Sequence, residues 1–180
     1  MVEAEYLAFE VMIIASSRFG TDYLAAQSIL SALATISFQV PFSISIATST
    51  RIAGLIGAGL VDAGKVAAKV AVTATWITGC INLFIYTLLQ YQLPFIFTDD
   101  PVVALLTTQV LPLLSVTTFL EGLAATAHGL LRGIGRQSIG GPATISAYYL
   151  VALPTSLALG VGLGWKLHGL LSGLTIGLAV

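Results

Sequence analysis

A single carboxylate, Glu121, lies deep inside an apolar stretch that begins at Pro101. No other Asp, Glu, Lys, Arg or His occurs from Pro101 through Ala127, and this stretch is longer than the roughly 20 helical residues that cross a bilayer core. An ionised carboxylate at such a depth costs at least about 2–3 kcal/mol. We therefore expect Glu121 to face protein, a water-filled cavity or a cation, which makes it a candidate functional residue. The alternative is a carboxyl group that only ties helices together through hydrogen bonds.

The composition indicates an integral membrane protein. Hydrophobic residues make up 57% of the chain and charged residues 8%, and the mean hydropathy is +0.98. A soluble domain carries about 25% charged residues, so this chain cannot cover a water-facing surface. The seven Lys and Arg residues are too few and too scattered for a nucleic-acid surface. Cys80 is the only cysteine, which excludes a disulfide framework and a cysteine-based metal site.

The apolar segments predict an all-α fold in one domain over residues 1–180, with five membrane helices and the start of a sixth. The expected helices cover residues 1–17, 23–48, 66–89, 101–127, 138–162 and 167–180. Pro41 predicts a kink in the second helix. The Gly-rich stretch 49–65 is expected to be a loop or a short interfacial helix, and 128–137 a basic connection.

The distribution of basic residues predicts the orientation of these helices. Five basic residues flank the second-to-third and fourth-to-fifth connections, and only two flank the other three connections. The five are Arg51, Lys65, Lys69, Arg132 and Arg136; the two are Arg18 and Lys166. Because basic residues are retained in the cytoplasm, the first two connections are expected there and Asp99–Asp100 outside. The N-terminus is acidic where a signal peptide is basic, so no cleavage is expected, and the missing basic flank indicates a fragment.

Two four-residue repeats indicate contacts between helices. A polar stripe in the second helix should face other helices rather than lipid. Its side chains would either hold helices together through hydrogen bonds or contact substrate. It comprises Gln27, Ser31, Thr35 and Gln39. A glycine repeat in the last helix permits close helix contact. It comprises Gly169, Gly173 and Gly177.

Several motif-like patterns carry no enzymatic chemistry. Gly59 to Lys65 resembles a phosphate-binding loop, but Val66 stands where Ser or Thr must bind Mg²⁺, and no buried strand precedes it. No Ser-His-Asp set and no metal-ligand cluster is present, and His128 and His168 are expected to be solvated residues at helix ends. The sequence therefore predicts no catalytic residue, no metal and no cofactor.

Two further acids, Glu5 and Glu10, lie near the start of the first helix. At about 100° per residue, Glu10 shares a face with Glu3 and Ser17, and Glu5 lies about 140° from that face. Because one narrow cavity cannot receive both faces of a straight helix, one acid is expected to exchange protons and the other to pair within the bundle. A desolvated carboxylate suits this exchange, since burial favours its protonated form and a bound cation favours its ionised form.

An ordered set of short motifs runs through essentially the whole chain. It comprises Glu5-x-x-Ala-Phe-Glu10, Leu24-Ala-Ala-Gln27-Ser28, Arg51-x-Ala-x-Leu-Ile-Gly57-Ala-Gly59, Ile96-Phe-Thr-Asp99-Asp100, Leu130-Leu-Arg132-Gly-Ile-Gly135-Arg-Gln137 and Tyr148-Tyr149-x-x-Ala-Leu-Pro154. This set resembles the multidrug and toxic compound extrusion (MATE) family, most closely its fungal branch, from the seventh membrane helix onward.

The resemblance implies the second six-helix lobe of a twelve-helix transporter that exports organic cations or drugs in exchange for H⁺ or Na⁺. It implies that Glu5, Glu10 and Glu121 are the coupling acids, and that Gln27, Tyr148 and Tyr149 line the cleft. The expected partners are the bilayer of a plasma or vacuolar membrane, the absent first lobe and a small organic cation. Without the first lobe the chain alone is not expected to transport.

Two other functions remain open at this stage. A lipid-linked oligosaccharide flippase of the same superfamily would line its cleft with cationic residues to hold phosphates, whereas the deep charges here are acidic. A truncated membrane protein that does not transport is the second alternative. Sequence upstream of Met1 would distinguish it from a transporter.

Overall fold

The computed structural model describes the backbone of residues 2–179 and the side chains of residues 7 and 10–179. The described chain is helical and contains no strand. Its α-helices are α1 (Val2–Ser16), α2 (Thr21–Gly57), α3 (Val61–Leu88), α4 (Pro101–Gly133), α5 (Gln137–Ile145), α6 (Leu153–Leu157) and α7 (Lys166–Ala179). Two π-helical segments, Ser146–Ala152 and Ala158–Gly162, join α5 and α6 into one continuous rod from residue 137 to residue 162.

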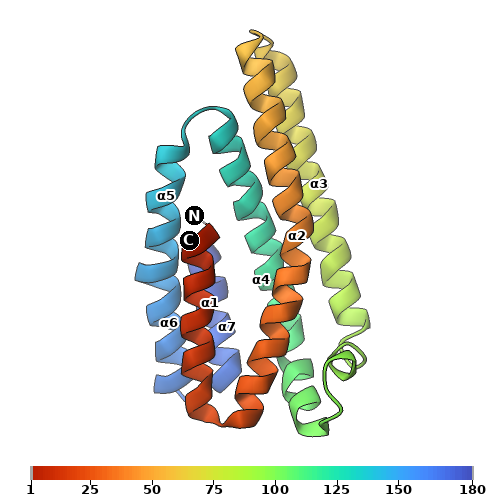
Figure 1. Ribbon diagram of the computed structural model, residues 1–180, viewed down its shortest axis with the longest axis vertical. Helices are drawn as coiled ribbons and strands as arrows, with labels where there is room; N and C mark the ends of the chain where they lie inside the picture. Colours follow the sequence, from red (N-terminus) through yellow and green to blue (C-terminus); the bar gives the residue numbers. More distant parts are fainter. Residues whose placement is uncertain (1, 180) are drawn as a thin grey trace.

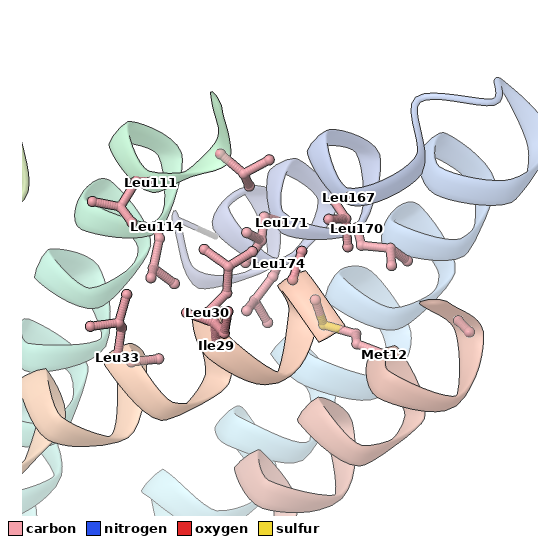
Figure 2. Packing of buried hydrophobic residues seen from close by; sticks show 14 of the residues in the cluster. Met12, Ile29, Leu30, Leu33, Leu111, Leu114, Leu167, Leu170, Leu171 and Leu174 are labelled. Atoms are coloured by element: carbon pink, nitrogen blue, oxygen red, sulfur yellow. The ribbon is translucent and has the colours of Figure 1, made fainter. Parts of the chain in front are cut away.

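The helices form two packed groups. The long helices α2, α3 and α4 stand together, and α1, α7 and the α5–α6 rod pack on one side of them (Figure 1). Leucines from α2, α4 and α7 interdigitate with Met12 of α1 in a single buried cluster (Figure 2). Helix α4 touches both groups, which makes it the central element of the bundle.

Four of these segments are long and apolar enough to cross a membrane. They are α2, α3, α4 and the rod over residues 137–162. Helices α1 and α7 have 15 and 14 residues, which correspond to only about 20 Å of helix against a bilayer core of about 30 Å. Helices with the length and composition of membrane spans, expected from the sequence, are therefore present, and α1 and α7 are shorter than the four long segments.

The connections differ from the expected ones in length. The stretch 49–65, expected to be a loop or a short interfacial helix, instead belongs largely to the two long helices, because α2 continues to Gly57 and α3 begins at Val61. Helix α4 likewise extends to Gly133 rather than ending before His128. Small residues and glycines suggest loops, but here tertiary contacts keep them helical: Gly133 packs so closely that an added Cβ atom would lie 3.0 Å from Ile52 of α2.

Helix α4 begins where its sequence directs. The carboxylate of Asp100 accepts a hydrogen bond from the backbone amide of Val102 at 2.8 Å, and Pro101 occupies the first helical position. Both features are typical of helix N-termini. Pro112 and, in α2, Pro41 lie inside uninterrupted helices.

The two connections with the most basic residues lie at the same end of the molecule. The α2–α3 turn and the α4–α5 turn are both at the top of Figure 1, and the α1–α2, α3–α4 and rod–α7 connections are at the bottom. We call the top the basic end and the bottom the acidic end, after Asp99 and Asp100. This alternation agrees with the helix order expected from the sequence.

The glycine repeat of α7 makes the close helix contact that its spacing predicts. A Cβ atom at Gly169 would lie 2.5 Å from the backbone nitrogen of Gly160, and one at Gly177 would lie 2.6 Å from the Cα atom of Ala152. Between these glycines the hydroxyl of Ser156 donates to the carbonyl of Leu170 at 2.8 Å. Helix α7 therefore lies directly against the backbone of the rod and fixes its depth.

Candidate functional site

Glu121 lies near the middle of α4 and is enclosed by protein. Its side chain is only 3% exposed. It lies 20 residues after Pro101 and 12 before Gly133, about 30 Å and about 18 Å along the helix. The expectation that this acid faces protein or a cavity rather than lipid is therefore confirmed.

The neighbours of Glu121 on α4 show which helices surround it. Thr117, one turn earlier on the same face, shares a 2.7 Å hydrogen bond with Thr175 of α7. Gly122 packs against α2, where an added Cβ atom would lie 3.1 Å from the Cγ atom of Pro41. Glu121 is therefore positioned between α7 and α2, toward the interior of the bundle.

Tyr148 lies at the same depth as Glu121. Thr175 of α7 and Thr117 of α4 are hydrogen-bonded and therefore lie at the same depth. Gly177, two residues further along α7, packs on Ala152 of the rod. Because the rod runs antiparallel to α4 (Figure 1), Glu121 falls between the levels of Ala152 and Tyr148. Tyr148 is only 3% exposed. The structure thus places a carboxyl group and a phenol, 27 residues apart in the sequence, at a similar depth in the bundle.

The neighbouring Tyr149 is half-buried and packs against the same apolar cluster. Each of Glu121, Tyr148 and Tyr149 takes part in a polar, aromatic or electrostatic interaction. Tyr148 belongs to the π-helical segment Ser146–Ala152. Such segments are uncommon and often occur at functional sites.

Gln27, in contrast, lies far from Glu121. Pro41 packs on Gly122, and Ile52 packs on Gly133. In both pairs the residue numbers differ by 81. The parallel helices α2 and α4 therefore keep one register, in which Glu121 is level with Val40. Gln27 is 13 residues nearer the acidic end, about 20 Å away. Its side chain is fully buried and its amide has no hydrogen-bond partner among the described residues.

The polar stripe that contains Gln27 is only partly buried. Ser31 is half-buried, but Thr35 and Gln39 are exposed. The expectation that the stripe faces other helices is therefore met within this chain by Gln27, whereas for Thr35 and Gln39 it stays a prediction that concerns the rest of the transporter. The helix twists relative to its neighbours, so a four-residue repeat drifts off the packed face.

The two acids of α1 differ in what the structure describes. Glu10 is exposed, on the side of α1 opposite the buried residues Met12, Ala15 and Ser16. The side chain of Glu5 lies outside the described residues. The described part of the chain therefore contains one buried carboxyl group in its spans, Glu121.

A hydrogen-bonded cluster beside Glu121 was not identified from the sequence. Asn82 of α3 donates to Thr118 of α4 at 3.1 Å and accepts from Ser37 of α2 at 3.2 Å. Tyr86 bonds to Ser37 and donates to the carbonyl of Leu33 at 2.8 Å. An asparagine inside an apolar helix was the available signal, since polar side chains at such positions join helices.

The basic end of α4 is tied to α2 and to the rod. Arg132 donates to the hydroxyl of Ser45 at 2.9 Å, and Ser45 donates to the carbonyl of Ala125 at 2.5 Å. His128, expected to be a solvated residue at a helix end, is half-buried and bonds to Thr144 at 3.0 Å. His168 is exposed.

The described residues contain no cluster of acids, histidines and cysteines that could hold a metal ion. Gly59 lies in the turn between α2 and α3, and Lys65 forms a 2.9 Å ion pair with Asp62 on the exposed side of α3. A helix rather than a strand precedes this turn, so the backbone geometry of a phosphate-binding loop is not present.

Comparison with known proteins identifies the arrangement. The MatE family profile matches residues 1–157. The chain belongs to the MATE family. It is 39% identical, over 97% of its length, to an uncharacterized transporter of Saccharomyces cerevisiae, and 33% identical, over 98%, to multidrug and toxin extrusion protein 1 of Homo sapiens.

A crystal structure of a eukaryotic MATE transporter superimposes on 97% of the chain with a TM-score of 0.89 and 27% sequence identity. The present chain spans 25% and 31% of the length of the two relatives and 39% of the solved chain. Because nearly the whole chain superimposes on part of this structure, its fold is that of one half of a MATE transporter, and the resemblance seen in the sequence motifs is confirmed.

Proposed function

We propose that the transporter containing this chain is a secondary antiporter that exports small organic cations, drugs or toxic metabolites in exchange for protons, with this chain as its second lobe. The observation that carries the proposal is the burial of Glu121, a carboxyl group enclosed in the middle of an apolar span. The name of the human relative, a multidrug and toxin extrusion protein, supports the class of substrate.

The chemistry of an enclosed carboxyl group suits proton exchange. Desolvation favours its neutral form, and an approaching cation favours its ionised form. A single group can therefore bind either a proton or a cationic substrate, and each displaces the other. Transport of this kind needs no covalent step, no metal and no cofactor; the gradient of protons, or alternatively of sodium ions, drives it.

The proposed cycle begins with the cleft open to the outside. A proton binds the carboxylate of Glu121, or of Glu5, and weakens its hold on the cationic substrate, which leaves. The two lobes then rock about the site, the proton departs to the cytoplasm, and the recharged carboxylate captures new substrate. Glu10, which is exposed on the side of α1 away from this bundle, would assist the exchange rather than pair within the bundle.

The aromatic groups near Glu121 support binding of an organic cation. Tyr148 shares its depth, and Tyr149 follows on the same segment. Aromatic faces attract cations, and this attraction is larger where water is excluded. Gln27 lies about 20 Å away along α2 and would contact substrate only nearer the acidic end of the cleft. The plasma membrane or the vacuolar membrane is the proposed location.

A purely structural role of Glu121 is the competing function, and two substitutions distinguish them. Glu121→Gln keeps shape and most hydrogen bonds but cannot alternate its charge, whereas Glu121→Asp keeps the charge and withdraws it by one methylene. We expect Glu121→Gln to lose pH-driven transport nearly completely and Glu121→Asp to retain weakened transport. If Glu121 only joins helices, the isosteric amide should be the milder change.

The measurement is uptake of a fluorescent organic cation into vesicles that contain the full transporter, under an imposed pH gradient and normalised to surface expression. Gln109→Ala, at an exposed polar position of the same helix, is the matched control. A parallel series under a sodium gradient separates the two driving ions. Near-normal pH-driven transport by Glu121→Gln would exclude Glu121 as the coupling group.

A further inference from the structure

A pocket of about 510 Å³ lies between α2, α3, α4 and the α3–α4 connection. Its α3 wall extends from Thr75 to Tyr86, about 17 Å of helix, and Phe97 lines it at the acidic end. Phe119 and Gly122 of α4 lie at its inner side. The pocket is therefore elongated along the helices and large enough to bind a molecule.

The rim of this pocket is continuous with an exposed apolar surface of the chain. Ile36 of α2, Ile81 of α3 and Ile96 of the connection line it and are 62%, 53% and 74% exposed. Helix α3 has only 17% of its membrane-spanning window buried, so most of its surface faces away from the bundle. Because Ile36 and Ile81 belong to helices of membrane-spanning length and composition, we expect a molecule that enters between them to come from the hydrocarbon of the bilayer rather than from water.

The polar groups in the pocket wall are hydrogen-bonded to other protein groups, so an occupant need not supply hydrogen bonds to them. Asn82 bonds to Ser37 and Thr118, and the hydroxyl of Tyr86 donates to the carbonyl of Leu33. Because these groups satisfy one another, the remaining lining is almost entirely hydrocarbon and aromatic. An apolar, elongated occupant fits such a lining, and a charged or strongly polar one would lose its hydration without compensation.

We propose that this pocket binds one acyl chain of a phospholipid from the leaflet at the acidic end. The head group would remain at the membrane surface near Tyr91 and Phe95, two exposed aromatic residues of the α3–α4 connection, and the chain would extend along α3 toward Phe119. Aromatic residues are typical of this interfacial level. The bound chain would support α4 from the side opposite α7, one residue from Glu121. The site does not depend on which substrate or ion the protein transports.

Quenching of tryptophan fluorescence by brominated lipid tests the proposal directly. The full transporter is placed in nanodiscs of phosphatidylcholine with bromine atoms on the acyl chains, and its native tryptophans, including Trp76 and Trp165, are replaced by phenylalanine. Phe119→Trp then puts the fluorophore in the pocket. Ile77→Trp, at an exposed position of α3 outside the lining, reports ordinary lipid contact.

We expect quenching of Phe119→Trp to approach that of Ile77→Trp. Adding Val40→Phe and Ile85→Phe, two exposed lining positions, should plug the mouth and reduce quenching of Phe119→Trp at least twofold without changing Ile77→Trp. Weak quenching of Phe119→Trp, or quenching that the plug does not change, would overturn the proposal. Weak quenching of Phe119→Trp would mean that another part of the transporter covers the opening of the pocket.

A second measurement avoids these substitutions. A phosphatidylcholine with a photoreactive diazirine at the end of one acyl chain is crosslinked to the unaltered transporter, and the modified peptides are mapped by mass spectrometry. Crosslinks at Phe119, Gly122 or Tyr86 support the site. Crosslinks confined to exposed α3 residues outside the lining, such as Phe84 and Leu88, contradict it.

Discussion

Pro41 of α2 lies directly against Gly122 of α4, where an added Cβ atom would come within 3.1 Å of the Cγ atom of the proline. This contact sets the distance between the two helices beside Glu121. It also gives a close approach at a point where α2 carries no backbone N–H, because proline lacks one. A residue larger than glycine at position 122 would therefore crowd the ring of Pro41.

Enlarging this glycine should destabilise the protein. Gly122→Ala is expected to lower stability by about 1–3 kcal/mol through overpacking, and Gly122→Val by more. Gly54→Ala on α2 is the control, because nothing lies within 4 Å of its added Cβ atom and alanine favours helix. Thermal unfolding of the purified transporter, followed by fluorescence-detected size exclusion, gives the comparison. Equal melting temperatures for Gly122→Ala and Gly54→Ala would contradict the contact.

Ser45→Ala should weaken the basic end of the bundle. The substitution removes the 2.5 Å hydrogen bond to the carbonyl of Ala125 and the acceptor of Arg132. We expect a loss of about 1–3 kcal/mol, since a buried partner is left without its bond. Ser43→Ala is matched, because that exposed hydroxyl bonds only to Gln39 within its own helix. Similar melting temperatures for the two variants would show that the link to α4 contributes no stability.

Asn82→Leu should loosen the contact of α3 with α2 and α4. It removes the bonds to Ser37 and Thr118 while keeping a similar volume. The expected cost is about 1–3 kcal/mol from the unpaired partners. Thr73→Val on the same helix is the control, because its hydroxyl is exposed and bonds only to Lys69. A stable Asn82→Leu protein with unchanged protection of α3 against hydrogen exchange would argue that apolar packing alone holds this helix.

The orientation in the membrane can be tested by cysteine labelling. In a Cys80→Ala background of the full transporter, Asp99→Cys should react with an impermeant reagent in intact cells, and Arg136→Cys only after permeabilisation. Both positions are exposed, so access depends on the side of the membrane rather than on burial. This labelling pattern is expected because basic connections such as the one with Arg136 are retained in the cytoplasm. The reverse pattern of labelling would invert the orientation.

The sequence by itself determined the class of fold and the depth of one acid. The scarcity of charge excludes a water-facing surface, and apolar segments of bilayer length can satisfy their backbone groups only as helices. The same reasoning placed Glu121 inside a span, and its side chain is 3% exposed. The four-residue glycine repeat also predicted the contact of α7, because small residues are selected wherever backbones touch.

The connections show where local patterns fail. Residues 49–57 contain glycines and small residues that favour a loop, yet they continue α2 because Ile52 packs on Gly133 of α4. Propensity is a weak signal, and contacts with residues far along the chain override it. The expectation that His128 is solvated is wrong for the same reason, because its partner Thr144 lies on another segment.

Only the tertiary structure decided which side chains share a site. Tyr148 and Glu121 lie at a similar depth in the bundle because α7 fixes the rod against α4. Gln27, which the sequence motifs also predict at the cleft, lies about 20 Å from the level of Glu121 along α2. The Asn82 cluster and the pocket beside it depend equally on three helices from different parts of the sequence. The spacing of residues along one helix determines which of them share a face of that helix. Their depth in the bundle and their contact residues follow from the register between helices. The packing of Pro41 on Gly122 and of Gly177 on Ala152 sets this register.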